Sequence, residues 1–323
     1  MDTGRIVRHV REGLSLSQEE FAERVGVGRL AVTRWENGGA VPNRIAQVRI
    51  HEIAKDGGID LFGHIMQALP EHRAEDDKAV LYHGSGSGIE GRIMPISRDL
   101  CDFGRGFYMG TRAHQPTTLV YPSEKAAIYT VEMDLTGLNV LCVPAGIEWA
   151  MLVAYSRGKL APCAGSALYE KYEKMLEGYD VVVGKIADDR IFYVLDRFFM
   201  GDVTDRGLVE SLSALQLGDQ YVAKTERACG QIRILERWDI SEIERLCIGE
   251  ASERNRRQGV EAANEICRRH RREGGSSTRS SRRGSYDRGP LGASAMRHPR
   301  PAVRALSGEG VRQREIHRPV HEV

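Results

Sequence analysis

Six short runs of apolar and β-branched residues between Ala79 and Thr225 constrain the fold more than any other feature of this 323-residue chain. Each run has the length of a β-strand, and helix-like stretches separate the runs from one another. This alternation predicts a mixed domain over residues 79–250, with a sheet and flanking helices. The six runs are AVLYH, GFYMGT, AIYTVEMDL, LNVLCV, DVVVGKI and DQYVAKT.

The first 60 residues have a different pattern, which is typical of short amphipathic helices. Ser17 and Glu20 form a capping box that opens a helix, and Phe21 lies on the expected buried face of that helix. The glycines of Gly26–Gly28 interrupt it, and a second helix is expected from about Arg29 to Asn37. Two short helices joined by a glycine-containing turn are typical of a helix-turn-helix, although the same signals fit an ordinary helical hairpin.

Charge is distributed unevenly along the chain, although the net charge is only +1. The segment from Arg268 to the C-terminus has 14 arginines, no lysine and five acidic residues, a net charge of +9, whereas residues 61–267 carry −8. A low apolar content with much Ser, Gly, Pro and Arg predicts an Arg-rich disordered tail over residues 251–323. The charged string PEHRAEDDK lies in a linker predicted over residues 61–78. The acidic centre of the chain disfavours a nucleic-acid backbone as its partner.

Several classes of protein are disfavoured by composition. The six cysteines are scattered without paired spacing, so neither a metal site nor a disulfide framework is expected, and a reducing cytoplasm fits them. The chain contains no run of about 18 apolar residues, so no membrane-spanning helix is expected. The N-terminal stretch MDTGRIVRHVREG is too charged for the apolar part of a secretory signal. The chain is therefore expected to be cytoplasmic and not bound to a membrane.

The strings SQEEFAERVGV and VTRWENG, followed by Pro42, resemble the lambda-repressor-type helix-turn-helix family of bacterial regulators. The resemblance implies that the second helix enters the major groove of DNA and that Trp35 lies in the domain core. It implies DNA contacts from Gln18, Arg29, Leu30, Thr33 and Arg34. Because residues 1–60 have no net charge, nonspecific attraction to DNA would be weak, and a homodimer on DNA is expected. A retained fold that no longer binds DNA is the alternative.

Two further motifs set a ring-bearing polar residue beside glycines, His83 in YHGS and Tyr108 in FGRGFYMG. Gly84 permits another group to approach the backbone closely. Taken alone, a histidine at a strand end is more often structural than catalytic, and Tyr108 fits a packing ring. The run of Gly84, Gly86 and Gly88 lacks the spacing and the following helix of a dinucleotide-binding fingerprint, so a Rossmann fold is rejected.

Five strings in a fixed order over about residues 79–235 resemble the ADP-ribosyltransferase superfamily, in its diphtheria-toxin and poly-ADP-ribose-polymerase branch. More specifically, they resemble a bacterial domain family of unassigned function allied to that branch. The strings are LYHGS, DFGRGFYMGT, IEWAMLVAYSRG, YDVVVGKIADD and LGDQYVAKTERA.

This second resemblance implies a domain of the α+β class, with a split β-sheet and helices, and a site for NAD as substrate. It implies catalytic positions at His83, Tyr108 and Gln220, and NAD contacts at Gly84, Ser85, Gly106 and Phe107. The ring of Tyr108 would stack on the planar nicotinamide cation and favour its charge. His83 would hold a ribose hydroxyl.

Gln220 departs from the glutamate that many of these transferases have at this position. A carboxylate would attract the positive charge that develops on the sugar, whereas an amide offers only a dipole. The resemblance therefore implies transfer of a single ADP-ribose, slow cleavage of NAD or binding of NAD alone, and it disfavours polymer synthesis. Glu226 is either a substitute acid or, as we favour, a charge on a helix surface. Glu148, Trp149 and Arg157 either line the site or pack.

Two functions remain open from the sequence. One is an NAD-dependent mono-ADP-ribosyltransferase with a DNA-binding head, which would suit a toxin-like or autoregulated effector whose ADP-ribose acceptor is unidentified. The other is a DNA-binding transcriptional regulator whose transferase-like domain binds NAD or a related nucleotide without catalysis.

Overall fold

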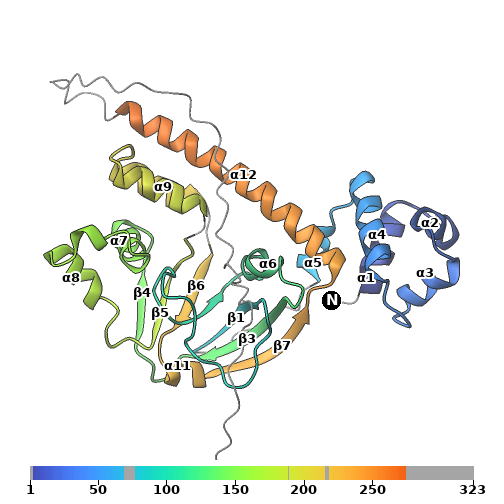
Figure 1. Ribbon diagram of the computed structural model, residues 1–323, viewed down its shortest axis with the longest axis horizontal. Coiled ribbons are helices and arrows are strands. Elements are labelled where there is room, and N and C mark those ends of the chain that lie inside the picture. The colour runs from blue at the N-terminus through green and yellow to red at the C-terminus, as the bar shows by residue number, and fades with distance from the viewer. Residues whose placement is uncertain (1–2, 69–76, 188, 215–217, 274–323) are drawn as a thin grey trace, which may run out of the picture. The chain divides into compact units, whose positions relative to one another are not determined.

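Helices form the N-terminal part of the chain, and a seven-stranded sheet with flanking helices follows them (Figure 1). The computed structural model describes residues 3–68, 77–187, 189–214 and 218–273. The mixed helix-and-sheet composition and the helical N-terminal domain agree with the prediction from sequence.

Five helices make up the head, by which we mean residues 3–68. Ser17 caps α2, because its side chain accepts a hydrogen bond from the Glu20 N–H while the Glu20 carboxylate accepts one from the Ser17 N–H at 2.8 Å. The capping box is therefore confirmed. Gly26 ends α2 with a φ of 85°, a left-handed conformation that glycine adopts without steric cost. The five helices are α1 (Thr3–Gly13), α2 (Gln18–Val25), α3 (Arg29–Glu36), α4 (Arg44–Asp56) and α5 (Leu61–Gln67).

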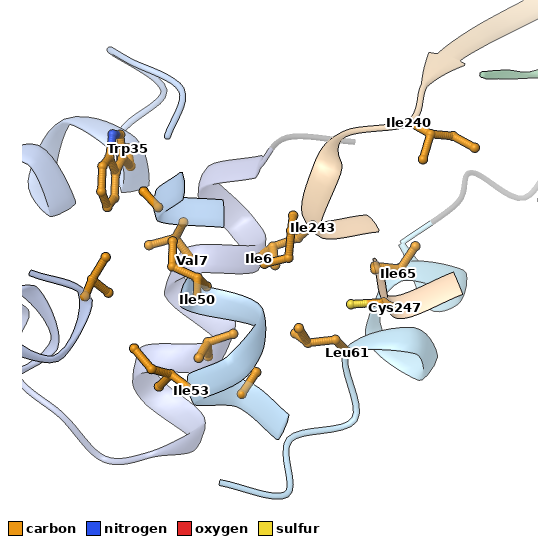
Figure 2. Close-up of a cluster of buried hydrophobic side chains, with 14 of the residues drawn as sticks. Ile6, Val7, Trp35, Ile50, Ile53, Leu61, Ile65, Ile240, Ile243 and Cys247 are labelled. Carbon is orange, nitrogen blue, oxygen red and sulfur yellow. The ribbon is translucent and has the colours of Figure 1, made fainter. Parts of the chain in front are cut away.

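The hydrophobic core of the head continues into the last helix of the chain, α12 (Glu242–Glu273). Phe21 and Ile50 are fully buried, and Trp35 is buried as the sequence predicts. Ile243 and Cys247 of α12 belong to the same cluster (Figure 2). The head and the sheet domain therefore share apolar packing and are not joined by a linker alone.

The seven strands lie in the order β4-β5-β6-β2-β1-β3-β7. β4 and β5 pair in parallel, and the other neighbouring strands pair antiparallel. The six predicted runs coincide with β1 to β6, and β7 is a further strand at one edge. The strands are β1 (Lys78–Ser85), β2 (Phe107–Gly110), β3 (Ala127–Asp134), β4 (Val140–Val143), β5 (Val181–Lys185), β6 (Asp219–Ala223) and β7 (Ile232–Asp239).

The two faces of the sheet pack in different hydrophobic clusters, apart from Ile128 of β3 and Trp238 of β7, which lie in the core shared by the head and α12. On one face, which we call the α7/α9 face, Val182 and Val222 pack with α7 and α9. On the other, the α11 face, Leu81 and Met109 pack with α11. The helices of this domain other than α12 are α6 (His114–Val120), α7 (Ile147–Ser156), α8 (Ala167–Lys174), α9 (Asp189–Phe199), α10 (Asp205–Ala214) and α11 (Glu226–Gly230).

The structure corrects the start of the predicted linker. Helix α5 occupies its first residues, and Asp60 caps this helix by accepting a hydrogen bond from the Gly63 N–H at 3.0 Å. Leu61 and Ile65 of α5 are buried in the core of the head. The prediction missed this helix because it is short and precedes a strongly charged string. Residues 69–76 of the predicted linker lie outside the described residues.

The structure also corrects the start of the predicted disorder, because α12 extends from Glu242 to Glu273. Ala251 and Ile266 are buried, Tyr193 of α9 donates a hydrogen bond to Asn264, and Arg269 pairs with a glutamate of α10 at 3.0 Å. The buried apolar residues of this part of α12 are few and lie among charged residues. The apolar content of the segment is therefore low, which is why its composition predicted disorder. The rest of the predicted tail, residues 274–323, lies outside the described residues.

No helix among the residues that the structure describes combines the length and apolar character needed to cross a membrane.

Candidate functional site

Three neighbouring strands carry the three residues predicted as catalytic, since β2 pairs with both β1 and β6. Tyr108 lies opposite Val222, and Gln220 lies opposite Gly110. Residues opposite each other in antiparallel strands share a face of the sheet, and so do alternate residues of one strand. Tyr108 and Gln220 therefore both point to the α7/α9 face.

His83 lies on the opposite face of the sheet. Tyr82 is opposite Gly110, so the next residue, His83, points to the α11 face. Its ring stacks on Phe107 with 4.1 Å between centroids. The structure thus brings Tyr108 and Gln220 to one face but not the His83 side chain, because the strand register decides the face.

The imidazole of His83 is held in one tautomer. Its Nδ1 lies 2.7 Å from the carbonyl oxygen of Tyr108. Because a carbonyl only accepts, Nδ1 carries the proton and Nε2 is left as an acceptor. Burial lowers the pKa of His83, and the hydrogen bond to Tyr108 offsets part of this effect. The imidazole is therefore neutral at neutral pH.

The hydroxyl of Tyr108 binds the loop that precedes β2. It donates to the carbonyl oxygen of Gly104 at 2.6 Å and accepts the N–H of Phe103 at 3.0 Å. Burial raises the pKa of Tyr108, so the phenol stays protonated at physiological pH. Lys224 closes the same loop by donating to the carbonyls of Phe103 and Arg105, and burial lowers the pKa of its amine to about 8. These bonds hold the Tyr108 ring in one orientation.

Gln220 belongs to a buried polar cluster that the sequence did not reveal. Its Nε2 donates to Asp102 Oδ2 at 2.7 Å and to the carbonyl oxygen of Lys185 at 3.0 Å. Asp102 is 4% exposed and also accepts hydrogen bonds from Arg157 Nε at 3.0 Å and from the Ala187 N–H at 2.9 Å. We call Asp102, Arg157 and Gln220 the Asp102 cluster. The available signal was an acidic residue at the start of DFGRGFYMG, in the loop that precedes β2.

The structure shows the contacts of the four residues whose roles the sequence left open. Trp149 is fully buried and donates its indole N–H to the carbonyl oxygen of Lys185 at 3.0 Å. Arg157 stacks on a phenylalanine ring of α9, Phe192, with 3.6 Å from Cζ to the ring centre. Glu148 pairs with Lys171 at 2.7 Å. Glu226 is an exposed charge paired with Arg92 at 3.6 Å, which is the surface alternative.

The glycines predicted to contact NAD are packed against the protein itself. A Cβ on Gly84 would lie 2.8 Å from the carbonyl oxygen of Pro116 on α6, and a Cβ on Gly106 would lie 2.4 Å from Val222. Ser85 donates its hydroxyl to the Gly88 carbonyl at 2.8 Å. The close approach that Gly84 and Gly106 permit is therefore made by α6 and β6. Within the described part of the chain, no group of three or more His, Cys, Asp or Glu is placed to hold a metal ion.

In the head, α3 presents most of the residues predicted for DNA contact. Arg29, Leu30 and Arg34 are exposed, Leu30 by 62%. Leu30 offers an apolar side chain between two arginines, and the thymine methyl group is an apolar partner for such a side chain in the major groove.

Gln18 and Thr33, the two other predicted DNA contacts, bind each other. Gln18 Oε1 accepts the Thr33 hydroxyl at 2.8 Å, and Gln18 Nε2 donates to Glu36 Oε2 at 2.9 Å. Glu36 is 7% exposed and receives Arg11 Nε at 2.6 Å. Burial alone would raise the pKa of Glu36, but the hydrogen bonds from Arg11 and Gln18 outweigh it and the pKa is lowered. This network ties α1, α2 and α3 together.

Comparison with protein families decides what the two parts of the chain are. Residues 7–48 match a family described as helix-turn-helix, and residues 79–234 match a family described as a protein of unknown function (DUF3990). The chain has a helix-turn-helix domain followed by a DUF3990 domain. No curated protein and no solved structure matches the chain.

The helix-turn-helix domain indicates DNA binding, in which the second helix of the motif reads the major groove. The DUF3990 domain contains His83, Tyr108 and all of the Asp102 cluster. The description of that family gives no activity, so the chemistry of the domain has to be inferred from these residues.

Proposed function

We propose that the protein binds DNA through α3 and that its DUF3990 domain binds NAD and transfers a single ADP-ribose. The observation that supports this most is the placement of Tyr108 and Gln220 on one face of two neighbouring strands, beside a buried carboxylate, Asp102. An aromatic ring and a fixed hydrogen-bonding group side by side are what a nicotinamide–ribose unit requires.

Tyr108 stacks on the nicotinamide ring in this proposal, because the negative face of a phenol attracts a planar cation. Two hydrogen bonds hold the Tyr108 hydroxyl before any ligand binds, so little side-chain entropy is lost on binding. The neutral His83, which bonds the Tyr108 carbonyl from the other face of the sheet, fixes the backbone of the same strand.

Gln220 accepts a hydrogen bond from a ribose hydroxyl as the bond between nicotinamide and the sugar breaks. Nicotinamide leaves with the bonding electron pair, positive charge develops on the sugar, and a lone pair of the acceptor then bonds the same carbon. The acceptor releases its proton to solvent as this bond forms. An amide oxygen stabilises this charge less than a carboxylate would. We therefore expect slow transfer of one ADP-ribose and no polymer.

A second function, a regulator that binds the nucleotide without catalysis, is favoured by the contact between the head and α12. Buried Gln47 donates to the carbonyl oxygen of Pro42 at 2.8 Å and accepts the N–H of Ile243 at 3.1 Å. Pro42 follows the DNA-reading helix, and Ile243 lies in the first turn of α12. Since α12 also binds α9, whose Phe192 stacks on Arg157, a ligand beside the Asp102 cluster has a physical route to the head.

The test is incubation of the full chain with NAD labelled in the nicotinamide and, separately, in the adenylate. We expect release of nicotinamide and one label per acceptor. The Tyr108→Ala variant should bind NAD about tenfold or more weakly, because a desolvated cation–π contact contributes about 2 kcal/mol. The matched control is Tyr221→Ala, which removes a partly buried tyrosine from the neighbouring strand but from the α11 face, and should leave binding unchanged.

The outcomes separate the two functions. Release of nicotinamide supports the transferase. Binding of NAD without release, together with a change in DNA affinity when NAD is added, supports the regulator. A wild-type chain that binds no NAD contradicts both.

A further inference from the structure

The Asp102 cluster determines which end of the Gln220 amide faces inward. The two groups nearest to the inward end are the Asp102 carboxylate at 2.7 Å and the carbonyl oxygen of Lys185 at 3.0 Å. Both can only accept, so only the NH2 end of the amide fits there. Rotating the amide by half a turn would bring its own oxygen against the oxygens of Asp102 and Lys185. The carbonyl oxygen Oε1 is thereby left as the unused end, and it receives no hydrogen bond from the described residues.

We propose that Asp102 is a positioning residue that makes Gln220 present its carbonyl oxygen, and not its NH2 group, to a hydroxyl of the bound nucleotide. The inference rests on the proposed function, because the ligand hydroxyl is the ribose hydroxyl of NAD. The group that meets the sugar is then an oxygen acceptor, as it would be with a glutamate, although Gln220 carries no charge.

Asp102 is itself held firmly enough to act in this way. Its carboxylate receives Arg157 on one oxygen and the Ala187 N–H on the other, and Arg157 is fixed by its stacking on Phe192. A carboxylate with these three partners, counting Gln220, has little freedom to turn away.

The same geometry explains why a glutamine and not a glutamate occupies position 220. A glutamate there would place a second carboxylate 2.7 Å from Asp102 Oδ2, beside the Lys185 carbonyl. Two ionised carboxylates at this distance repel each other strongly in a buried site, and the repulsion ends when one of them takes up a proton. The glutamine at position 220, in place of a glutamate, is therefore explained by the negative charge of Asp102 beside it.

The decisive variant is Gln220→Glu, compared with Gln220→Met, which has a similar shape and no polar end. A protonated glutamate has an O–H that donates to Asp102 as the amide does, whereas an ionised one repels it. The charged groups around position 220 are Asp102, Arg157 and the Lys185–Asp219 pair at 2.8 Å. Relative to wild type at the same pH, Gln220→Glu should bind NAD about tenfold or more weakly at about pH 8 and recover most of this loss at about pH 5.5. Gln220→Met should be weak at both pH values.

A ligand-free measurement separates this inference from the proposed function. The urea midpoint of Gln220→Glu, relative to wild type, should rise as the pH falls, and at about pH 8 the double variant Asp102→Asn, Gln220→Glu should be more stable than Gln220→Glu. A midpoint of Gln220→Glu that follows wild type at every pH overturns the role of Asp102, whatever NAD does. The ligand-free pattern can hold while the wild type binds no NAD. That result would contradict the proposed function and the hydrogen bond from the ribose hydroxyl to Gln220, but it would still support the orientation of the Gln220 amide by Asp102.

Discussion

The head and the DUF3990 domain each contain a buried carboxylate that accepts side-chain hydrogen bonds from one arginine and one glutamine. In the head, Glu36 is bound by Arg11 and Gln18. In the DUF3990 domain, Asp102 is bound by Arg157 and Gln220. In both clusters the glutamine is a residue that the sequence assigned to function.

The two clusters differ in whether the carbonyl oxygen of the glutamine side chain accepts a hydrogen bond. Gln18 Oε1 accepts the Thr33 hydroxyl, and Arg11 also donates to the carbonyl of Leu16, so the head network closes on itself. The Gln220 carbonyl receives no hydrogen bond from the described residues, and the Arg157 side chain is 32% exposed against 15% for Arg11. The same chemistry therefore locks helices together in the head and leaves one acceptor, the Gln220 carbonyl oxygen, unused by the described residues of the DUF3990 domain.

The largest effect should come from Arg11→Met, which leaves the Glu36 carboxylate buried with its main counter-charge removed. Removing one partner of a buried ion pair costs about 3–5 kcal/mol of unfolding free energy. Urea denaturation of the full chain measures this loss, and hydrogen exchange should place it in α1 to α3.

The matched control is Arg157→Met in the other cluster. Its cost should be smaller, about 1–3 kcal/mol, because Arg157 is partly exposed and Asp102 keeps the Ala187 N–H and Gln220. Equal losses in both variants would contradict the distinction between a closed and an open cluster.

The contrast between the regions also explains what the sequence could predict. Ser17, Glu20 and Gly26 lie within ten residues of one another, so local rules located the helices and the turn of the head, and Trp35 was placed in the core correctly. Strand positions were predicted for the same reason. The face on which His83 lies was not, because it depends on pairing between β1 and β2 and not on the strand itself.

The Asp102 cluster joins residues that no local pattern connects, since Asp102 and Gln220 are 118 positions apart. Their meeting follows from the order of β2 and β6 in the sheet, which the sequence pattern does not determine. Helix α12 was missed for a different reason, because its buried residues are too sparse to raise the apolar content of its segment.

A second prediction concerns the boundary between the two regions, where α12 belongs to both. Ile243→Ala and Ile191→Ala each remove a fully buried isoleucine, the first from the core of the head and the second from the α7/α9 face. Each should cost about 2–5 kcal/mol. Only Ile243→Ala should also weaken DNA binding under conditions where both variants remain folded, because the Ile243 side chain packs in the hydrophobic core of the head, which also contains Trp35 of α3. Denaturation and DNA titration together test this, and an equal loss of DNA affinity in Ile191→Ala would show that the head responds to general loss of stability.

The smallest effect should be the response of the head to acid, which tests whether Glu36 carries the charge in its cluster. The lowered pKa of Glu36 means that the folded head binds a proton less readily than the unfolded chain. The stability that this carboxylate contributes is therefore fully present above its ordinary pKa of about 4.3, and it is lost as the pH falls further. The loss should be smaller than in Arg11→Met, because a protonated carboxyl still accepts hydrogen bonds from Arg11 and Gln18. Hydrogen exchange of α2 and α3 between pH 7 and about pH 3, corrected for the chemical exchange rate, measures it. The Glu36→Gln variant should be less stable at pH 7, and its stability should depend less on pH. An unchanged acid response in that variant would assign the titration to another carboxylate.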